Sequence, residues 1–373
     1  MIKKIIISTA LSFLFFLPVL VLASENNENE KEDLIFKARV LEVLEQVEKE
    51  SDNQEIIIQQ DIKLLGLEGD FKNKEIFYYG IGDVELIGAK IYNPGDNVLV
   101  LATNLENPVY YVIDYVRSNK LFFIVLIFAI ILFIVGKWKG LRSLISLLLT
   151  FVVIIFFIIP NIMAGLNPVL ITFLGSLVIL LVIIYLTEGF NLRSHVALAS
   201  TFISLLLVIF ISFLFISLTK LTGVFSDDVF ILLNIGGQSI NLKGMLLAGM
   251  IIGALGVLDD VVISQVAAVE QLSLANPSQS WTEVFKKAYQ IGISHISSMT
   301  NTLFLAYAGA SLPLLLLFVS PDSPFGSFEQ IINNEAIATE IVRALSGSLG
   351  IILSVPLATL IASWFFVYRQ KNN

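Results

Sequence analysis

The chain has 373 residues, of which 56% are hydrophobic and 14% are charged, and its mean hydropathy is +0.84. An ordinary soluble domain carries charge on roughly a quarter of its residues, so this composition excludes a typical soluble globule. The net charge of −8 argues against a nucleic-acid partner, and the absence of cysteine excludes disulfides, thiolate metal sites and cysteine nucleophiles.

The N-terminal segment has the pattern of an export signal. A basic start, Lys3-Lys4, precedes the apolar run Ile5–Leu22, which ends in Val21-Leu22-Ala23. Val21 and Ala23 stand three residues and one residue before Ser24, and small residues at these −3 and −1 positions are typical of a cleavage site. We therefore predict a signal peptide over residues 1–23, with an uncleaved anchor helix as the alternative, followed by a polar linker over 24–33.

Residues 34–117 are predicted to form a small extracytoplasmic β-domain. Short runs rich in Ile, Val and Tyr alternate here with turns that contain Gly, Asn and Pro, and this spacing favours a compact β-barrel-like or sandwich fold. The expected strands are Leu34–Val40, Glu55–Leu65, Glu75–Tyr79, Glu85–Ile91, Asn97–Leu101 and Val109–Val116. Because no catalytic cluster is evident, we interpret the domain as a module through which an envelope protein could bind.

The remainder, residues 118–373, is predicted to be a polytopic α-helical membrane domain. About 20 apolar residues in helical form cross the hydrocarbon core of a bilayer, so each long apolar block is a candidate span. Seven such blocks give seven predicted transmembrane helices: Leu121–Val135, Leu144–Ile159, Val169–Leu186, Val196–Leu218, Met245–Val269, Ile296–Val319 and Ala338–Val367.

Loop charges predict the orientation of these spans. One set of loops is basic and contains Lys137, Lys139, Arg142, Arg193, Lys286, Lys287, Arg369 and Lys371. The other set contains Lys220 and Lys243 together with Asp227, Asp228, Asp322, Glu329 and Glu335. The positive-inside rule places the basic set and the C-terminus in the cytoplasm, and this agrees with export of the β-domain.

The fifth apolar block contains two adjacent acidic residues, Asp259 and Asp260. Asp259 lies about 24 Å along a helix from Lys243, so both are expected near the middle of the membrane. A charge at this depth costs roughly 2.5–3.5 kcal/mol on insertion scales, so two adjacent acids indicate a function beyond helix packing. We predict that a proton or a hard cation binds at Asp259 and Asp260, with no other cofactor and no assigned metal.

Helical spacing suggests a different environment for each acid. Gly249, Gly253 and Gly256 share a face with Asp260, and small residues of this kind let a second helix approach closely. Asp260 is therefore expected to face a protein contact or a hydrated cavity, whereas Asp259 points about 100° away. The three glycines are the predicted helix-packing residues.

Further coupling candidates are Gln265 in the same block and Ser298 and Asn301 in the next one. Hydroxyl groups in membrane helices often bond to their own backbone, so the amide of Asn301 has the stronger need for a partner. In the last block, Arg343 could pair with Glu340 or extend toward the interface, and we assign it no function.

Several segments of the chain resemble the YibE/F family of bacterial membrane proteins. The matching segments are Asp114–Arg117, Lys139–Ser143, Gly253–Asp260, Gln265, Thr300–Ala310, Leu312-Pro313 and parts of Arg343–Pro356. The resemblance implies a multi-pass protein of the bacterial plasma membrane and supplies no established activity.

A fainter similarity is to RND-type transporters and the SecF export subunit, in which a glycine-rich helix carries one or two mid-membrane aspartates. Gly256, Asp259 and Asp260 match that outline. Glu270 departs from that outline, because it lies ten residues after Asp260, whereas RND helices usually place a glutamate closer to the aspartates. Similarity of this kind does not by itself establish transport.

Two functions from different classes fit the sequence. The first is a cation- or proton-coupled transporter or export accessory that uses the Asp pair. The second is a non-transporting envelope scaffold or sensor whose β-domain binds a partner. An intramembrane protease is disfavoured, because both acids lie on one helix and Gly256-Val257-Leu258-Asp259 lacks the Gly-x-Gly-Asp pattern. No enzyme is predicted, and a homo-oligomer remains open.

Overall fold

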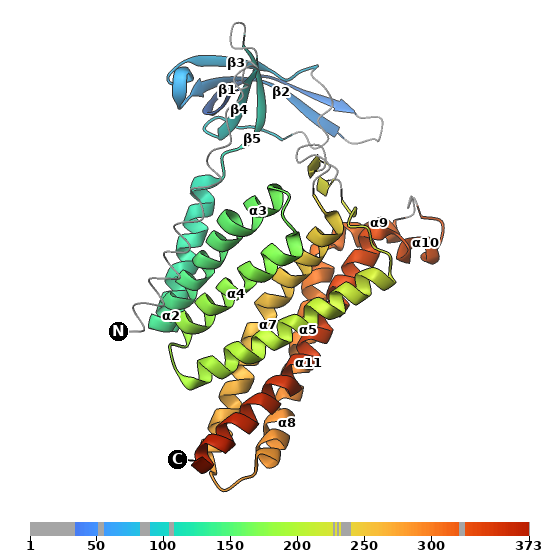
Figure 1. Cartoon of the computed structure of the whole chain (residues 1–373). Coiled ribbons are helices and arrows are strands. Elements are labelled where there is room, and N and C mark those ends of the chain that lie inside the picture. Colours follow the sequence, from blue (N-terminus) through green and yellow to red (C-terminus); the bar gives the residue numbers. More distant parts are fainter. Residues whose placement is uncertain are drawn as a thin grey trace. The chain divides into compact units, whose positions relative to one another are not determined.

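The computed structural model describes residues 34–50, 56–82, 90–103, 108–226, 228–229, 231–232, 240–320 and 325–372. The predicted signal peptide and polar linker lie outside these residues. The described chain divides into two compact units, residues 34–131 and residues 132–372. The first contains a β-sheet and the start of the first long helix, and the second contains the remaining helices (Figure 1).

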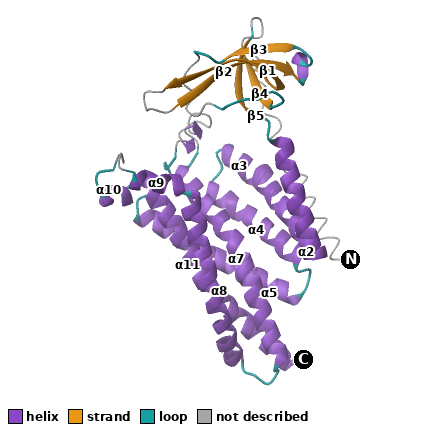
Figure 2. Cartoon of the chain, turned by 180° about the vertical axis from the view of Figure 1, so that it is seen from behind, coloured by secondary structure: helices purple, strands orange, loops and turns teal. Residues whose placement is uncertain are grey.

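Five antiparallel strands form one open sheet in the order β3-β2-β1-β4-β5, drawn in orange in Figure 2. Their bounds are Leu34–Glu50 for β1, Ile56–Gly66 for β2, Glu75–Tyr79 for β3, Asn97–Thr103 for β4 and Val109–Tyr115 for β5. The expected barrel-like closure is not found, because no ladder joins β3 to β5 within the described residues. The additional strand expected at Glu85–Ile91 falls largely on residues that the structure does not describe.

One face of the sheet carries the core of the β-domain. Alternate residues of β3 and β4 are buried, as the two-residue period of a strand requires. Phe71, on the short helix η2 (Gly69–Phe71), stacks on Phe36 of β1 with ring centroids 4.3 Å apart. The core contains Phe36, Ala38, Val40, Ile62, Leu64, Phe71, Ile76, Tyr78, Tyr92, Val98, Val100, Ala102 and Val112.

A charged junction ends the sheet. The Asp114 carboxylate accepts hydrogen bonds from Arg117 and Lys90, each at 2.7 Å, and from the backbone N–H of Tyr115. These bonds hold the pKa of the Asp114 carboxyl well below its ordinary range. Burial raises the pKa of Tyr92 in the same region to about 12. The Asp114 carboxylate therefore connects Lys90, the end of β5 and Arg117.

The long helices begin directly after this junction. The helical elements are α2 (Ser118–Val153), the π-helix η3 (Ile154–Ile158), α3 (Ile159–Met163), α4 (Pro168–Thr187), α5 (Leu192–Leu218), α7 (Leu242–Ala275), α8 (Trp281–Ala310), α9 (Leu312–Val319), α10 (Phe328–Ile332) and α11 (Glu335–Asn372). Within α2, Lys137 has non-helical backbone angles, with φ 48° and ψ −133°.

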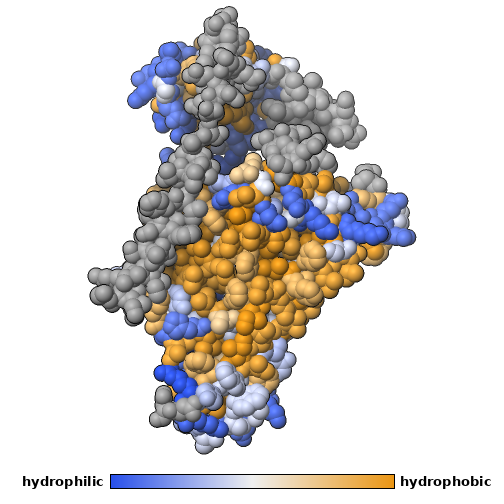
Figure 3. Space-filling view, viewed as in Figure 1, coloured by the Kyte–Doolittle hydropathy of each residue, from blue (hydrophilic) through white to orange (hydrophobic). Residues whose placement is uncertain are grey.

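The helices of this unit have the length and composition of membrane-spanning helices. Five described helical stretches are long and apolar enough to cross one, or six if α8 and α9, which meet at a 69° bend, count as one broken span. Apolar residues cover most of the helical surface seen in Figure 3. The seven predicted spans exceed this count, because two predicted blocks fall in one continuous stretch, Ser118–Met163.

α7 is the central helix of this unit. It packs against α4, α5, α8 and α11, and every hydrophobic cluster of the helical unit contains residues of α7. In its most apolar window 61% of residues are buried, compared with 17% for the stretch Ser118–Met163. Side chains at the centre of α7 are therefore shielded by protein on most sides.

Candidate functional site: a carboxyl pair at the centre of α7

α7 holds the two acids at its midpoint. The helix has 34 residues and begins where Asn241 accepts a hydrogen bond from the N–H of Gly244 at 2.9 Å. Asp259 follows Leu242 by about 25 Å along the axis and precedes Ala275 by a similar length. The pair therefore lies at the middle of α7.

The environments of the two acids differ from each other. Asp259 is only 5% exposed, whereas Asp260, which was expected to face protein or a cavity, is exposed. The reason is geometric: neighbours on an α-helix point about 100° apart, and the helices around α7 cover the side of Asp259. The protected acid is thus Asp259.

Asp259 has apolar surroundings and no side-chain partner. Its Oδ1 is buried without a hydrogen-bond partner, and no ion pair to it is found within the described residues. The side chains one and two turns away on its own face are all packed into hydrophobic clusters: Ile252, Leu255, Ile263 and Val266. A charged carboxylate in such a place is costly unless something neutralises it.

Several buried hydroxyl groups on the helices around α7 also lack partners. They lie on α4, α5 and α11: Thr172, Ser176, Ser200, Ser212, Thr339 and Ser348. Buried polar atoms are normally hydrogen-bonded, and groups of unpaired ones call for water, an ion or a functional role. The interior of the helical unit is accordingly more polar than packing alone requires.

The face of α7 that carries Asp260 is open. A Cβ at Gly249 or Gly256 would have no atom within 4 Å, and the only close neighbour of the three glycines is the Tyr307 hydroxyl, 2.9 Å from a Cβ at Gly253. The packing role predicted for the glycines therefore finds a partner only at Gly253 in the described part of the chain. Ser264, one turn beyond Asp260, donates to the Asp260 carbonyl at 2.8 Å.

Gln265 connects three helices. Its side chain is fully buried, and Nε2 donates to the carbonyl of Ala288 on α8 at 2.9 Å and to Thr359 Oγ1 on α11 at 2.7 Å. Gly292 of α8 lies against the same amide and against Val355. This geometry gives Gln265 a structural role in holding α7, α8 and α11 together.

The two candidates on α8 lie on its exposed surface. Ser298 and Asn301 are both exposed, and no hydrogen bond joins either to Asp259 or Asp260 within the described residues. The backbone carbonyl of Ser298 accepts from Thr302 Oγ1 at 3.0 Å, as hydroxyl groups in helices commonly donate. The carboxyl pair and these two residues therefore do not form one hydrogen-bonded cluster in the described part of the chain.

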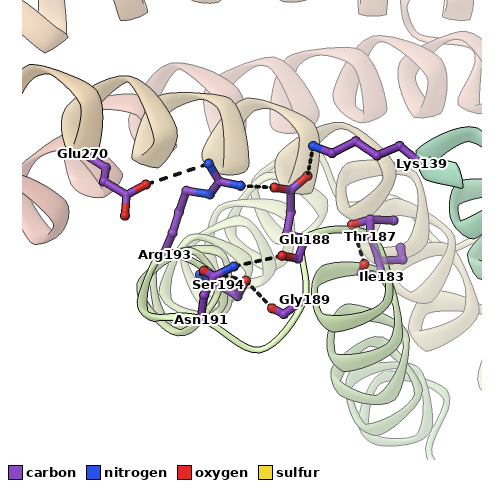
Figure 4. A network of polar contacts seen from close by, with 9 residues as sticks. All are labelled: Lys139, Ile183, Thr187, Glu188, Gly189, Asn191, Arg193, Ser194 and Glu270. Atoms are coloured by element: carbon purple, nitrogen blue, oxygen red, sulfur yellow. Dashed lines mark hydrogen bonds and ion pairs between the residues drawn. The ribbon is translucent and has the colours of Figure 1, made fainter. Parts of the chain in front are cut away.

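One end of the unit has an ion network that sequence reasoning missed (Figure 4). Arg193, at the start of α5, pairs with Glu188 and reaches Glu270 of α7 at 3.8 Å, and Lys139 approaches Glu188 at 3.6 Å. Asn191, the N-cap of α5, donates to the Glu188 carbonyl at 2.8 Å. This contact gives Glu270 a partner at the end of α7.

The pairing of Arg343 with Glu340 that the sequence suggested is found in the structure. Arg343 of α11 pairs with Glu340 at 2.7 Å, and its guanidinium lies 5.6 Å from the ring centroid of Phe225. The three-residue spacing of Glu340 and Arg343 predicted the pair, whereas the contact of Arg343 with Phe225 could not be predicted from the sequence.

Groups of three or more His, Asp or Glu side chains suited to a metal ion are absent from the described residues. The carboxylate oxygens at the centre of α7 are those of Asp259 and Asp260, and carboxylate oxygen is a ligand that hard cations accept.

Comparison with known proteins identifies the family. The family model described as YibE/F-like protein matches residues 124–368, from α2 to near the end of α11, and so includes every candidate residue above. The segment Asp114–Arg117 lies outside this match. No curated protein and no solved structure is significantly similar to the chain. The match covers well over half of the sequence, and the chain is a multi-pass membrane protein that belongs to the YibE/F-like family.

Proposed function

We propose that the protein is a proton- or cation-coupled transporter or export accessory of the plasma membrane, in which Asp259, assisted by Asp260, takes up and releases the coupling ion. One observation carries the proposal: Asp259 lies at the centre of the most buried apolar helix, and its Oδ1 has no partner. An ionisable residue in such a position is a functional-site hypothesis by default.

Neutralisation explains why a carboxyl group is tolerated there. An uncompensated charge within the hydrocarbon costs roughly 2.5–3.5 kcal/mol on insertion scales, and a proton or a bound cation removes that cost. Release of the ion restores the charge and makes the same packing unfavourable. Loading and unloading of Asp259 would therefore favour different arrangements of α7 against its neighbours, which is the element that coupling requires.

Charge displacement after a rapid pH jump tests the proposal. Full-length protein in proteoliposomes on a solid-supported membrane is expected to give a transient current, because protons move part of the way across the membrane to reach Asp259. Asp259→Asn is expected to abolish at least nine-tenths of the displaced charge. A jump in Na⁺ or Mg²⁺ at constant pH distinguishes a metal cation from a proton.

The matched control is Asp228→Asn, which removes an exposed carboxylate outside α7 and should leave the current unchanged. The alternative scaffold function predicts no current from the native protein. It also predicts that Asp259→Asn lowers the amount of protein in the membrane without any separate loss of activity. A full-size current from Asp259→Asn together with Asp260→Asn would falsify the proposed role of the pair.

We further infer that the stretch Ser118–Met163 crosses the membrane twice, which restores seven spans. A straight helix of its 46 residues would extend about 69 Å, more than twice the hydrocarbon thickness. The non-helical angles of Lys137 support a reversal at that residue. A Cβ at Gly140 would also meet the backbone of Leu132, which lies two turns away in a continuous helix.

Single cysteines test this topology, since the native chain contains none. In intact cells a membrane-impermeant maleimide is expected to label Lys72→Cys in the β-domain and Ala164→Cys after α3, but not Lys139→Cys, which should react only after permeabilisation. All three positions are exposed. If the stretch crossed once, Lys72→Cys and Ala164→Cys would react from opposite sides, and the two-span interpretation would be lost.

A further inference from the structure

One face of α8 is polar, exposed and without partners in the described chain. It consists of five residues within nine positions: Ser294, Ser297, Ser298, Asn301 and Thr302. On a helix that turns 100° per residue these side chains fall within an arc of about 140°, opposite to the buried Leu303. Among the described residues, the only hydrogen bond made by any of the five side chains is that of Thr302 to the carbonyl of Ser298, at 3.0 Å.

This polar face lies deep along a predicted membrane span. Lys287 is the last Lys, Arg, Asp or Glu of α8, and Asn301 follows it by 14 residues, or about 21 Å along the axis. Lipid chains form no hydrogen bonds, so a polar group that faces them loses the bonds that it makes in water. A hydroxyl group can bond to its own backbone instead, but the Asn301 amide needs a partner from elsewhere.

Contacts with α7 agree with this depth. Gln265 of α7 bonds to the carbonyl of Ala288, and the Tyr307 hydroxyl lies 2.9 Å from a Cβ at Gly253. The two helices therefore run in opposite directions, and residues 288–307 of α8 lie beside residues 253–265 of α7. The polar face is thus level with the centre of α7, where Asp260 lies.

The chemistry of the face fits a second copy of the same face. It contains no charged side chain, so it does not call for a partner of opposite charge. Hydroxyl and amide groups both donate and accept hydrogen bonds, so two identical faces can satisfy each other. Two-fold symmetry about the membrane normal brings equivalent residues together at one depth, and amide side chains are known to bond across membrane helices.

The undescribed part of this chain fits the face less well. Its longest segment is residues 1–33, in which the apolar run Ile5–Leu22 offers only three hydroxyl groups and no amide side chain. The other undescribed segments have seven residues or fewer, which is too short to cover a face that spans nine positions of a helix.

We propose that the protein forms a homodimer in the membrane through this polar face of α8, with the Asn301 amides of the two copies hydrogen-bonded to each other near the two-fold axis. The dimer supplies the partners that the five side chains lack in one copy. This inference does not depend on ion coupling by Asp259, and it concerns a surface on the opposite side of α8 from Leu303.

Oxidative cross-linking of full-length protein in native membranes tests the interface, since the native chain contains no cysteine. Ser298→Cys replaces one small exposed side chain by another and is expected to form a disulfide-linked dimer with copper phenanthroline. The matched control is Leu353→Cys, which is exposed on α11 between Ser346 and Thr359, two residues that contact α7. Leu353 points about 200° away from Val355, which packs against α8, so this variant should remain monomeric.

The Asn301 amide is tested by dilution of labelled protein in lipid vesicles, with the dimer fraction counted by single-molecule photobleaching. Asn301→Leu is expected to raise the dissociation constant of the dimer roughly tenfold. Asn301→Gln keeps an amide and should stay close to the native value. Because Asn301 is exposed, neither change leaves a cavity inside one copy.

Three outcomes would overturn the interface. A Ser298→Cys monomer whose thiol reacts with an impermeant maleimide would mean that water covers the face, and one whose thiol stays unreactive would mean that lipid does. Equal cross-linking of Ser298→Cys and Leu353→Cys would indicate random collisions. A native dissociation constant in Asn301→Leu would remove the amide pair from the contact.

Discussion

Gly292→Ala is expected to lower the melting temperature of the detergent-solubilised protein by several degrees, because one added methyl group has no room. A Cβ there would overlap Val355 of α11 and lie 3.0 and 3.1 Å from Oε1 and Nε2 of Gln265. Val355 is fully buried and β-branched, so it cannot turn aside. Overpacking of this kind costs about 1–3 kcal/mol.

The matched control is the same substitution on an open face. Gly256→Ala meets no atom within 4 Å, and alanine favours a helix by about 1 kcal/mol over glycine, so its melting temperature should be unchanged or slightly higher. Equal melting temperatures for the two variants would mean that α8 and α11 do not approach each other at Gly292. A large loss at Gly256 would instead point to a neighbour outside this chain on that face.

The contrast between these glycines shows where sequence reasoning stopped. Gly249, Gly253 and Gly256 repeat at helical spacing, and only Gly253 has a close neighbour from another helix in the described chain. Small residues permit a second helix to approach closely but do not require it. Gly292 of α8 lies outside that repeat, yet Val355 of α11 and Gln265 of α7 pack closely against it. Only the three-dimensional arrangement of α7, α8 and α11 distinguishes the two cases.

The same limit explains why the burial of Asp259 could not be predicted from the sequence. Helical periodicity gives the angle between the two side chains, about 100°, and their depth follows from the length of the apolar block. Neither quantity says on which side the other helices lie. The glycines predicted that Asp260 faces a protein contact or a hydrated cavity, and the structure adds that Asp259 is the acid buried by the neighbouring helices.

In the β-domain, local signals succeeded and non-local ones did not. Alternating apolar residues predicted β3 and β4 almost to the residue, because a half-buried strand needs that alternation. Strand order depends on which segments pair across the sheet, and β1 pairs with both β2 and β4. A closed barrel would require pairing between the two edge strands, β3 and β5, and the described sheet has no such pairing.

Arg193→Gln is expected to destabilise the helical unit by about 1–3 kcal/mol, since it leaves two partly buried carboxylates, Glu188 and Glu270, without their shared cation. Breaking a fully buried pair costs about 3–5 kcal/mol, and the lower figure allows for the 16–25% exposure of these side chains. The double variant Arg193→Gln with Glu188→Gln should recover part of the loss, because it removes one of the stranded charges.

Lys139→Gln provides the comparison, since Lys139 approaches the same Glu188 at 3.6 Å but is 75% exposed. An exposed pair contributes at most about 1 kcal/mol, so this variant should unfold at nearly the native temperature. Thermal unfolding of the four proteins in one detergent measures the difference. If Arg193→Gln were no more damaging than Lys139→Gln, Glu270 would have to be held by solvent, and α7 would be anchored at that end by packing alone.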